Sequence, residues 1–164
     1  MKEIFSDLVK DFKEHKFDVI AHGCNCYNIM GAGIAKTIRN AYPEVFIVDR
    51  DFNAPKGRQR LGKLSIYHHS VSNQYIVNCY TQDTIGIKGV IDVPFEIDKF
   101  EECLQKLYDI KNYPTLTPPI RLGLPYIGGG LGGGDRKAIR TLIEKYAKAN
   151  KELFETTLVD FKKW

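Results

Sequence analysis

Residues 122–140 read LGLPYIGGGLGGGDRKAIR. A short apolar run ends at Pro125, six glycines broken only by Leu131 fill residues 128–134, and Asp135 opens an amphipathic segment. This pattern predicts a strand, a glycine loop and a helix. Glycine costs an ordered backbone roughly 0.5 to 1 kcal/mol relative to alanine, so six of them indicate either a flexible linker or a backbone that comes very close to a ligand.

The flanks of this loop favour the ligand interpretation. Leu122 and Leu124 before it and the periodic apolar residues after it have the pattern of buried positions, so both ends are clamped to rigid elements. Exposed amides followed by a helix N-terminus are typical of an anion site, usually for phosphate. The Gly-Lys-Ser/Thr of a Walker loop and the spacing of a dinucleotide GxGxxG loop are both missing.

Bulk composition is that of one soluble globular domain spanning residues 1–164, with 43% hydrophobic and 27% charged residues. No apolar run approaches the ~20 residues of a membrane span, and the N-terminal charges do not resemble a signal peptide. We therefore expect a cytoplasmic protein whose four cysteines are buried free thiols, without a zinc site. The net charge of +4 suits an anionic small molecule as well as a nucleic acid.

The periodicity predicts alternating strands and helices, and hence a three-layer α/β fold with a mixed central sheet. Strands are expected at 1–5, 18–22, 63–68, 74–80, 121–124 and 156–161, with the third and fourth as an antiparallel pair. Helices are expected just after residue 7 and at 34–42, 44–51, 95–108 and 135–149. Residues 52–62 and 113–119 are predicted to be exposed connections, and 81–94 a long connection.

A second loop rich in glycine and amides occupies residues 23–33, which read GCNCYNIMGAG. It also follows a strand and precedes a helix, so both loops should open at the carboxyl edge of the sheet. One ligand could then touch both loops. Two phosphate-seeking loops at one edge favour a diphosphate over a single phosphate.

Several polar side chains near these loops have two interpretations. Asp7 is either a helix N-cap or an acceptor for an amino group such as that of adenine. His22 ends a buried strand and is either a proton donor or acceptor or a structural residue. Asn25 and Asn28 hold ribose hydroxyls or serve as plain turn residues.

Three carboxylates complete the candidates. Asp135 stands where the glycine loop meets its helix, and we favour an N-cap there because its charge would repel a phosphate. Asp83 and Asp92, in the long connection, are candidates for orienting a water molecule.

Three segments resemble macro domains, the ADP-ribose-binding modules. Residues 22–35 (HGCNCYNIMGAGIA), followed by Ala-Tyr-Pro at 41–43, resemble their first ligand loop, and residues 124–135 (LPYIGGGLGGGD) resemble their second. Residues 4–8 (IFSDL) resemble their opening segment. Residues 78–82 (NCYTQ) are similar to a strand end in the branch of ADP-ribose 1''-phosphate phosphatases. The similarity runs through nearly the whole chain in the right order.

The resemblance implies roles residue by residue. Asp7 would bind the adenine amino group, with Leu8 and Phe161 beside the ring; Asn25 would hold the distal ribose. Residues 31–35 and 127–131 would wrap the diphosphate. The implied binding set is Asp7, Leu8, Cys24, Asn25, Met30, Gly31, Ala32, Gly33, Ile34, Ala35, Pro125, Tyr126, Ile127, Gly128, Gly129, Gly130, Leu131 and Phe161. His22 matches a histidine proposed to be catalytic in some phosphatases, and Asn25 and Asp92 complete the expected catalytic set.

Two positions depart from the family pattern. Where the branch that removes ADP-ribose from glutamate or DNA has a catalytic aspartate, this chain has Gly132, and no convincing lysine partner is visible. Many relatives have tryptophan after the aspartate of the second loop, and this chain has Arg136. The first departure counts against that hydrolase branch.

The resemblance thus implies a metal-independent phosphatase, without a cofactor, that converts ADP-ribose 1''-phosphate to ADP-ribose. Two alternatives stay open: a de-ADP-ribosylating hydrolase acting on protein or nucleic acid, and a non-catalytic ADP-ribose-binding module. The expected partner is a small ADP-ribose derivative, with nucleic acid only as a modified substrate and no membrane. We expect a monomer.

Overall fold

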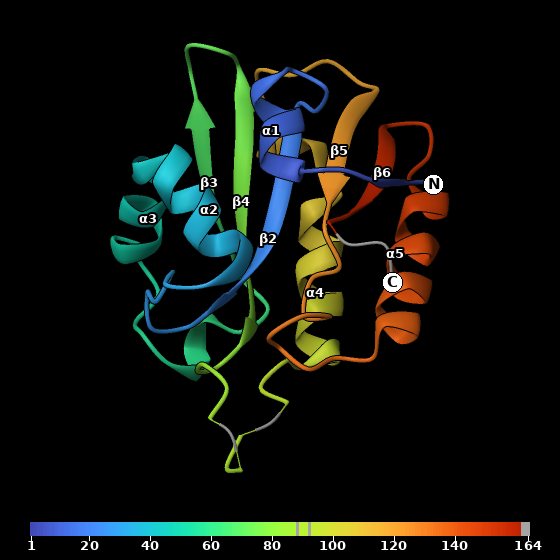
Figure 1. Cartoon of the computed structure of the whole chain (residues 1–164). Helices are drawn as coiled ribbons and strands as arrows, with labels where there is room; N and C mark the ends of the chain where they lie inside the picture. The colour runs from blue at the N-terminus through green and yellow to red at the C-terminus, as the bar shows by residue number, and fades with distance from the viewer. Residues whose placement is uncertain (88, 92, 162–164) are drawn as a thin grey trace.

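A computed structural model describes residues 1–87, 89–91 and 93–161. Its centre is a six-stranded sheet in the order β1-β6-β5-β2-β4-β3 (Figure 1). All neighbouring strands pair in parallel except β3 and β4, which form the expected antiparallel pair. The strands are β1 Lys2–Phe5, β2 Val19–Asn25, β3 Leu64–His69, β4 Gln74–Gln82, β5 Ile120–Leu124 and β6 Phe154–Asp160.

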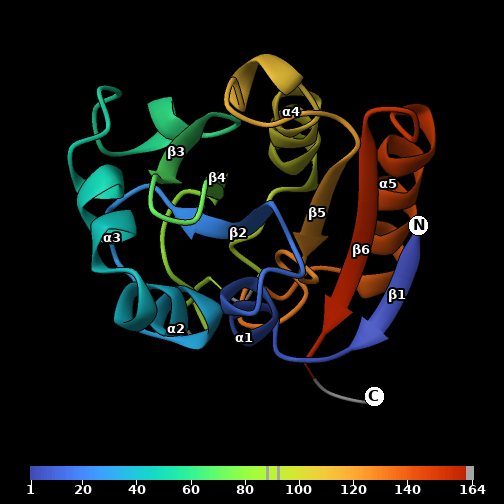
Figure 2. The same cartoon turned by 90° about the horizontal axis from the view of Figure 1, so that it is seen from above.

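Helices cover both faces of this sheet (Figure 2). One face carries α1 Leu8–Lys13, α2 Gly33–Ala41 and α3 Pro43–Arg50, whose buried residues share a core with Ile20 and Ile76 of the sheet. The other carries α4 Ile97–Leu107 and α5 Arg136–Ala149, packed on Val77 and Leu122. Two 3-10 turns, η1 Arg58–Arg60 and η2 Ile110–Asn112, complete the chain. The expected three-layer α/β fold with a mixed sheet is confirmed.

The central strands are buried on both faces, which explains their sequences. Every residue of β4 except Gln82 is buried, and so is every residue of β2 except Gly23. Parallel strands between two helical layers favour such nearly continuous apolar runs. Among the described residues, no helix is long and apolar enough to cross a bilayer.

The strand order reverses between β5 and β2, which pair with each other through Val19 and Leu122. From β5 the chain continues through α5 to β6 on one side, and from β2 it continues through α2 and α3 toward β3 and β4 on the other. The loops after β5 and β2 therefore diverge from adjacent strand ends. In α/β sheets this is the position of the ligand crevice.

Two predicted exposed connections are partly wrong. In residues 52–62, Arg60 is 2% exposed, because Asp49 and backbone carbonyls satisfy its guanidinium in the interior. In residues 113–119, Tyr113 is 1% exposed and packs its ring against Phe154 and Tyr75. The first segment was expected to be exposed because it is polar and basic, and the second because it is rich in proline. Arg60 and Tyr113 find their partners only in the folded chain.

Candidate functional site

Two loops converge at the carboxyl edge of the sheet, at the lower end of the molecule in Figure 1. We call residues 26–32, after β2, loop 1, and residues 125–134, after β5, loop 2. A Cβ built on Gly33, where loop 1 enters α2, would lie 3.7 Å from Leu131 Cδ1 of loop 2. Beneath them, a Cβ on Gly23 would lie 2.9 Å from Ile127 Cγ2. The prediction that both loops share one edge is confirmed.

Loop 2 is an ordered turn rather than a linker. The Gly134 amide donates to the Gly128 carbonyl at 2.7 Å, and the Gly133 amide donates to the Gly130 carbonyl at 3.1 Å. Gly128 has a φ of +79°, and a Cβ there would overlap the Phe95 ring. Glycine at this position is therefore required both by the backbone conformation and by space.

Several amides of loop 1, loop 2 and the first turn of α2 have no protein acceptor among the described residues. In the described chain, the N–H groups of Gly130, Leu131 and Gly132 donate to no protein atom. The same is true of residues 31–35, because the first bond into α2 is from the Lys36 amide to the Ala32 carbonyl. Loop 1 with the first turn of α2, and loop 2, thus both have backbone N–H groups that can donate to a ligand.

The two helix N-termini at this edge differ. Ala32, the N-cap of α2, supplies no side-chain hydrogen bond, so the helix end opposite Leu131 is uncapped. Asp135, the N-cap of α5, accepts from the amides of Lys137 at 2.8 Å and Ala138 at 3.2 Å. The N-cap interpretation of Asp135 is confirmed, and α2 keeps the open positive end.

Asn25 braces loop 1. Its Oδ1 accepts from the amide of Tyr27 at 2.9 Å, and its Nδ2 donates to the Ile29 carbonyl at 2.8 Å. Asn28 has a φ of +59° and turns its amide toward α3 rather than toward the crevice. Asn25 thus serves as a turn residue of loop 1. Its contact with the distal ribose and its catalytic role stay predictions.

His22 lies deep in the sheet and is completely buried. Its Nε2 is 2.6 Å from Asn78 Oδ1, and burial lowers its pKa to about 4 despite that contact. A neutral ring without a path to solvent does not support direct proton transfer to a ligand in this conformation. The structural alternative for His22 is the one that the geometry favours.

The other predicted ligand residues differ in burial and in hydrogen bonding. Leu8, Cys24 and Met30 are buried in the core on the α1–α3 face of the sheet, and their ligand roles stay predictions. Asp7 caps α1, accepting from the amides of Val9 and Lys10 at 3.0 Å each, and this confirms its N-cap alternative.

Adenine contacts by Asp7, and by Phe161, whose side chain is 75% exposed, stay predictions. Asp92 lies outside the described residues.

Asp83 is the candidate carboxylate beside loop 1. Its carbonyl accepts from the Cys26 amide at 2.9 Å, and its Oδ1 is buried with no hydrogen-bond partner among the described residues. Arg58 Nη1 lies 3.8 Å from its other carboxylate oxygen. The Thr81 hydroxyl, in β4 beside Gly23 of β2, is likewise buried and without a described partner. The sequence analysis included Thr81 only in the NCYTQ strand end and assigned it no role, because a hydroxyl in a buried strand gives no local signal.

Arg136, at the position of the family tryptophan, anchors loop 2. Its guanidinium stacks 3.7 Å from the centroid of the Tyr126 ring, and its Nη2 donates to Asp160 at 2.5 Å. Tyr126 in turn donates to Glu3 at 2.6 Å. A cation therefore fills this position and connects loop 2 to β6 and β1.

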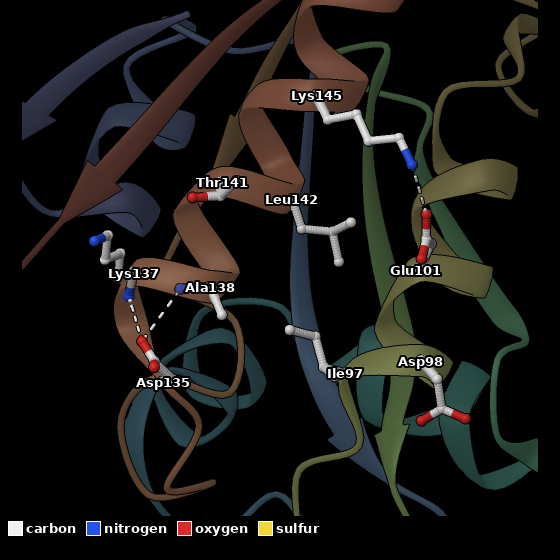
Figure 3. A pocket seen from close by; sticks show the side chains of 9 residues that line it. All are labelled: Ile97, Asp98, Glu101, Asp135, Lys137, Ala138, Thr141, Leu142 and Lys145. Atoms are coloured by element: carbon white, nitrogen blue, oxygen red, sulfur yellow. Dashed lines mark hydrogen bonds and ion pairs between the residues drawn. The ribbon is translucent and has the colours of Figure 1, made fainter.

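A separate hollow of about 590 Å³ lies between α4 and α5 (Figure 3). Ile97 and Leu142 face each other across it, and an ion pair between Lys145 and Glu101 spans its rim at 3.1 Å. Loop 1 contributes nothing to its lining. Among the described residues, no cluster of three metal-ligating side chains was found. All four cysteines are buried free thiols, as expected.

This sheet order, with two glycine-containing loops meeting at the switch point, defines the macrodomain fold. The macrodomain of Mycobacterium tuberculosis DarG superimposes with a TM-score of 0.76 at 16% identity, covering 96% of this chain and 95% of that one. Thermosipho africanus DarTG, solved in complex with ADP-ribose, gives 0.70 at 20% identity over 88% of this chain and 38% of the other.

A sequence relative comes from Enterobacteria phage T4. It is an uncharacterised 17.5 kDa protein of the tk-vs intergenic region, 29% identical over 163 residues, which are 98% of this chain and 96% of the relative. No family model matches the chain. The solved structures thus establish a macrodomain fold, and the activity has to be argued from the site.

Proposed function

We propose that the crevice between loop 1 and loop 2 binds ADP-ribose, with the diphosphate lying against the amides of both loops. The observation that carries this proposal is the uncapped N-terminus of α2 opposite the glycines of loop 2. A helix N-terminus carries about half a positive charge, and unpaired amides are strong donors. A diphosphate matches this arrangement because it supplies several charged acceptors within one small group.

The ADP-ribose complex of Thermosipho africanus DarTG supports this ligand. A diphosphate joined to two sugars offers more charged acceptors to the two loops than a single phosphate does. Asp7 and Phe161 are then proposed to lie at the adenine end, and Asn25 at the distal ribose.

We further propose that the chain removes the terminal phosphate of ADP-ribose 1''-phosphate. In this reaction water attacks phosphorus, the bond between phosphorus and the anomeric oxygen breaks, and the products are ADP-ribose and inorganic phosphate. Phosphoryl transfer depends mainly on positioning and charge stabilisation, which amides at a helix N-terminus supply. Asp83 is the carboxylate that we propose to orient the water, because it adjoins loop 1 and its side chain is 28% exposed.

A specific observation favours a second candidate, a module that binds ADP-ribose without turning it over. His22 is buried and Asn25 is occupied within its own loop, so two of the three expected catalytic groups are engaged internally. A de-ADP-ribosylating hydrolase is the less favoured enzyme because Gly132 stands where that branch has its aspartate.

The deciding experiment measures binding and turnover separately. Calorimetry with ADP-ribose, ADP and AMP tests the ligand, and ADP-ribose should bind more tightly than AMP. Phosphate release from ADP-ribose 1''-phosphate is then compared with ADP-ribose release from modified protein and DNA. Binding with phosphate release supports the phosphatase, and binding without either release supports the module. Absence of ADP-ribose binding would refute the proposal.

A matched pair of variants tests the proposed carboxylate. Asp83→Asn should reduce phosphate release by about 100-fold and leave ADP-ribose affinity within a few-fold of the parent. Asp98→Asn, an exposed aspartate of α4, makes the same chemical change outside the crevice and should leave both quantities unchanged. Equal turnover in the two variants would remove Asp83 from catalysis.

A further inference from the structure

A buried ion pair lies below loop 1. Asp49 at the end of α3 and Arg60 in η1 have side-chain exposures of 1% and 2%, and Arg60 Nη1 lies 3.3 Å from Asp49 Oδ1. The guanidinium also donates to the carbonyls of Ala54 and Asp49, each at 2.9 Å. Charges removed from water in this way destabilise a fold unless all their polar atoms are satisfied. Here the second carboxylate oxygen is satisfied by the ligand loop.

That second oxygen, Asp49 Oδ2, accepts a hydrogen bond from the side chain of Asn28 in loop 1. The Asn28 Nδ2 donates to Asp49 Oδ2 at 2.8 Å and contacts the Phe46 carbonyl at 3.3 Å. Asn28 has a φ of +59°, which asparagine tolerates better than most residues because its side chain bonds locally. The backbone at residue 28 is therefore held in a rare conformation by a charged acceptor beneath it.

The first oxygen connects the pair to the sheet. Tyr80 donates its hydroxyl to Asp49 Oδ1 at 2.6 Å, and the chain of contacts continues through Ser65 at 2.9 Å to Asn78 at 3.0 Å. His22 joins its far end at 2.6 Å. One carboxylate thus links the strands under the crevice to the loop above them.

We propose that Asp49 and Arg60 are positioning residues for the ligand site: the buried pair holds Asn28 and thereby sets the course of residues 29–33. The amides of residues 31–35 are then aligned before a ligand arrives. Loop 1 leads directly into the uncapped N-terminus of α2. A loop that is already ordered in the free protein loses less conformational entropy on binding, and this raises its affinity for a diphosphate. This inference rests on the proposed ADP-ribose site.

An exchange of the two polar groups tests the proposal. Asn28→Asp has nearly the same shape but places a carboxylate against Asp49, and should weaken ADP-ribose binding about 10-fold. In the double variant Asn28→Asp/Asp49→Asn, the amide at position 49 can donate to the carboxylate at position 28, so the hydrogen bond is restored with its direction reversed. The new negative charge stays in loop 1. The double variant should bind more tightly than Asn28→Asp alone, because the repulsion is relieved, and less tightly than the parent, because Arg60 has lost its charged partner. A repulsion between residue 28 and the ligand phosphates would leave the double variant as weak as the single one.

Tyr80→Phe is the matched control. It removes a hydrogen bond to the sheet-facing oxygen of Asp49 and leaves the contact with Asn28 in place. It should lower the melting temperature without changing ADP-ribose affinity. If Tyr80→Phe weakens binding as much as Asn28→Asp, or if the double variant binds no better than the single one, the positioning role is refuted.

A second readout separates this inference from the proposed function. In the free protein the amides of Tyr27 and Ile29 donate to Asn25, and the amide of Lys36 donates to Ala32. Hydrogen exchange of these three amides should become faster in Asn28→Asp and return toward the parent rate in the double variant. If the parent protein fails to bind ADP-ribose, the proposed function is refuted while this exchange pattern still reports on the loop. If the parent binds and exchange is unaltered in Asn28→Asp, only the positioning role is refuted.

Discussion

Alanine at two glycines of loop 2 should have different effects: Gly128→Ala should lower the stability of the fold, and Gly130→Ala should lower the affinity for ADP-ribose. Gly128 has a φ of +79°, and a Cβ there would overlap the Phe95 ring, so Gly128→Ala introduces both backbone strain and overpacking. The left-handed conformation costs alanine about 1 kcal/mol and overpacking about 1 to 3 kcal/mol. The sum of about 2 to 4 kcal/mol is a large part of a typical domain stability of about 5 to 15 kcal/mol.

Gly130 provides the comparison within the same turn. A Cβ at Gly130 would have no heavy atom within 4 Å, and its φ lies outside the positive region. The free energy of unfolding of Gly130→Ala should therefore lie within about 0.5 kcal/mol of that of the parent. Its methyl group would stand next to an unpaired amide of the crevice, so ADP-ribose binding should weaken about 10-fold.

Thermal unfolding followed by circular dichroism measures the first effect, and calorimetry with ADP-ribose measures the second. At this chain length each kcal/mol shifts the melting temperature by about 2 to 4 °C, so Gly128→Ala should melt about 4 to 16 °C lower. A Gly128→Ala protein that melts with the parent would refute the packing argument. A Gly130→Ala protein that loses as much stability would refute the distinction between the two sites.

Three further predictions concern caps, anchors and pH. Asp135→Ala should cost about 1 kcal/mol in urea unfolding, because two amides of α5 lose their acceptor. Arg136→Ala should weaken ADP-ribose binding more than Arg140→Ala in calorimetry, because only Arg136 stacks on Tyr126 of loop 2. Burial lowers the pKa of His22 from 6.5 to about 4 in the folded state, so the unfolded chain binds a proton at this residue more readily. The contribution of neutral His22 to the free energy of unfolding is therefore fully present above about pH 6.5. About 3 kcal/mol of it should be lost as pH falls to 4, and His22→Gln should flatten this part of the pH profile in urea unfolding.

The burial of His22 also bears on the catalytic question. A histidine with a pKa near 4 would not produce a neutral-pH limb in a rate profile. Phosphate release that changes with a pKa between 6 and 7 would argue that His22 becomes exposed in the complex. A flat profile from pH 6 to 8 would agree with its structural role.

The amino-acid sequence by itself determined much of the architecture. Apolar periodicity located all six strands and the principal helices, because local patterns report which side of an element is buried. The capping roles of Asp7 and Asp135 and the shared edge of the two loops also followed from position in the chain. These features depend on residues that are close in sequence or on general rules of sheet topology.

Only the tertiary structure decided which polar groups are available to a ligand. Asn28 had two possible roles, as a ribose ligand or as a turn residue, and its hydrogen bond to Asp49 forms only when α3 packs under loop 1. Arg60 looked like part of a surface connection until the fold enclosed it with that same carboxylate. His22 could be either reactive or structural until its burial beside Asn78 was known. The physical reason is that burial and hydrogen-bond partners are set by segments 11 to 56 positions apart, and no local pattern carries that information.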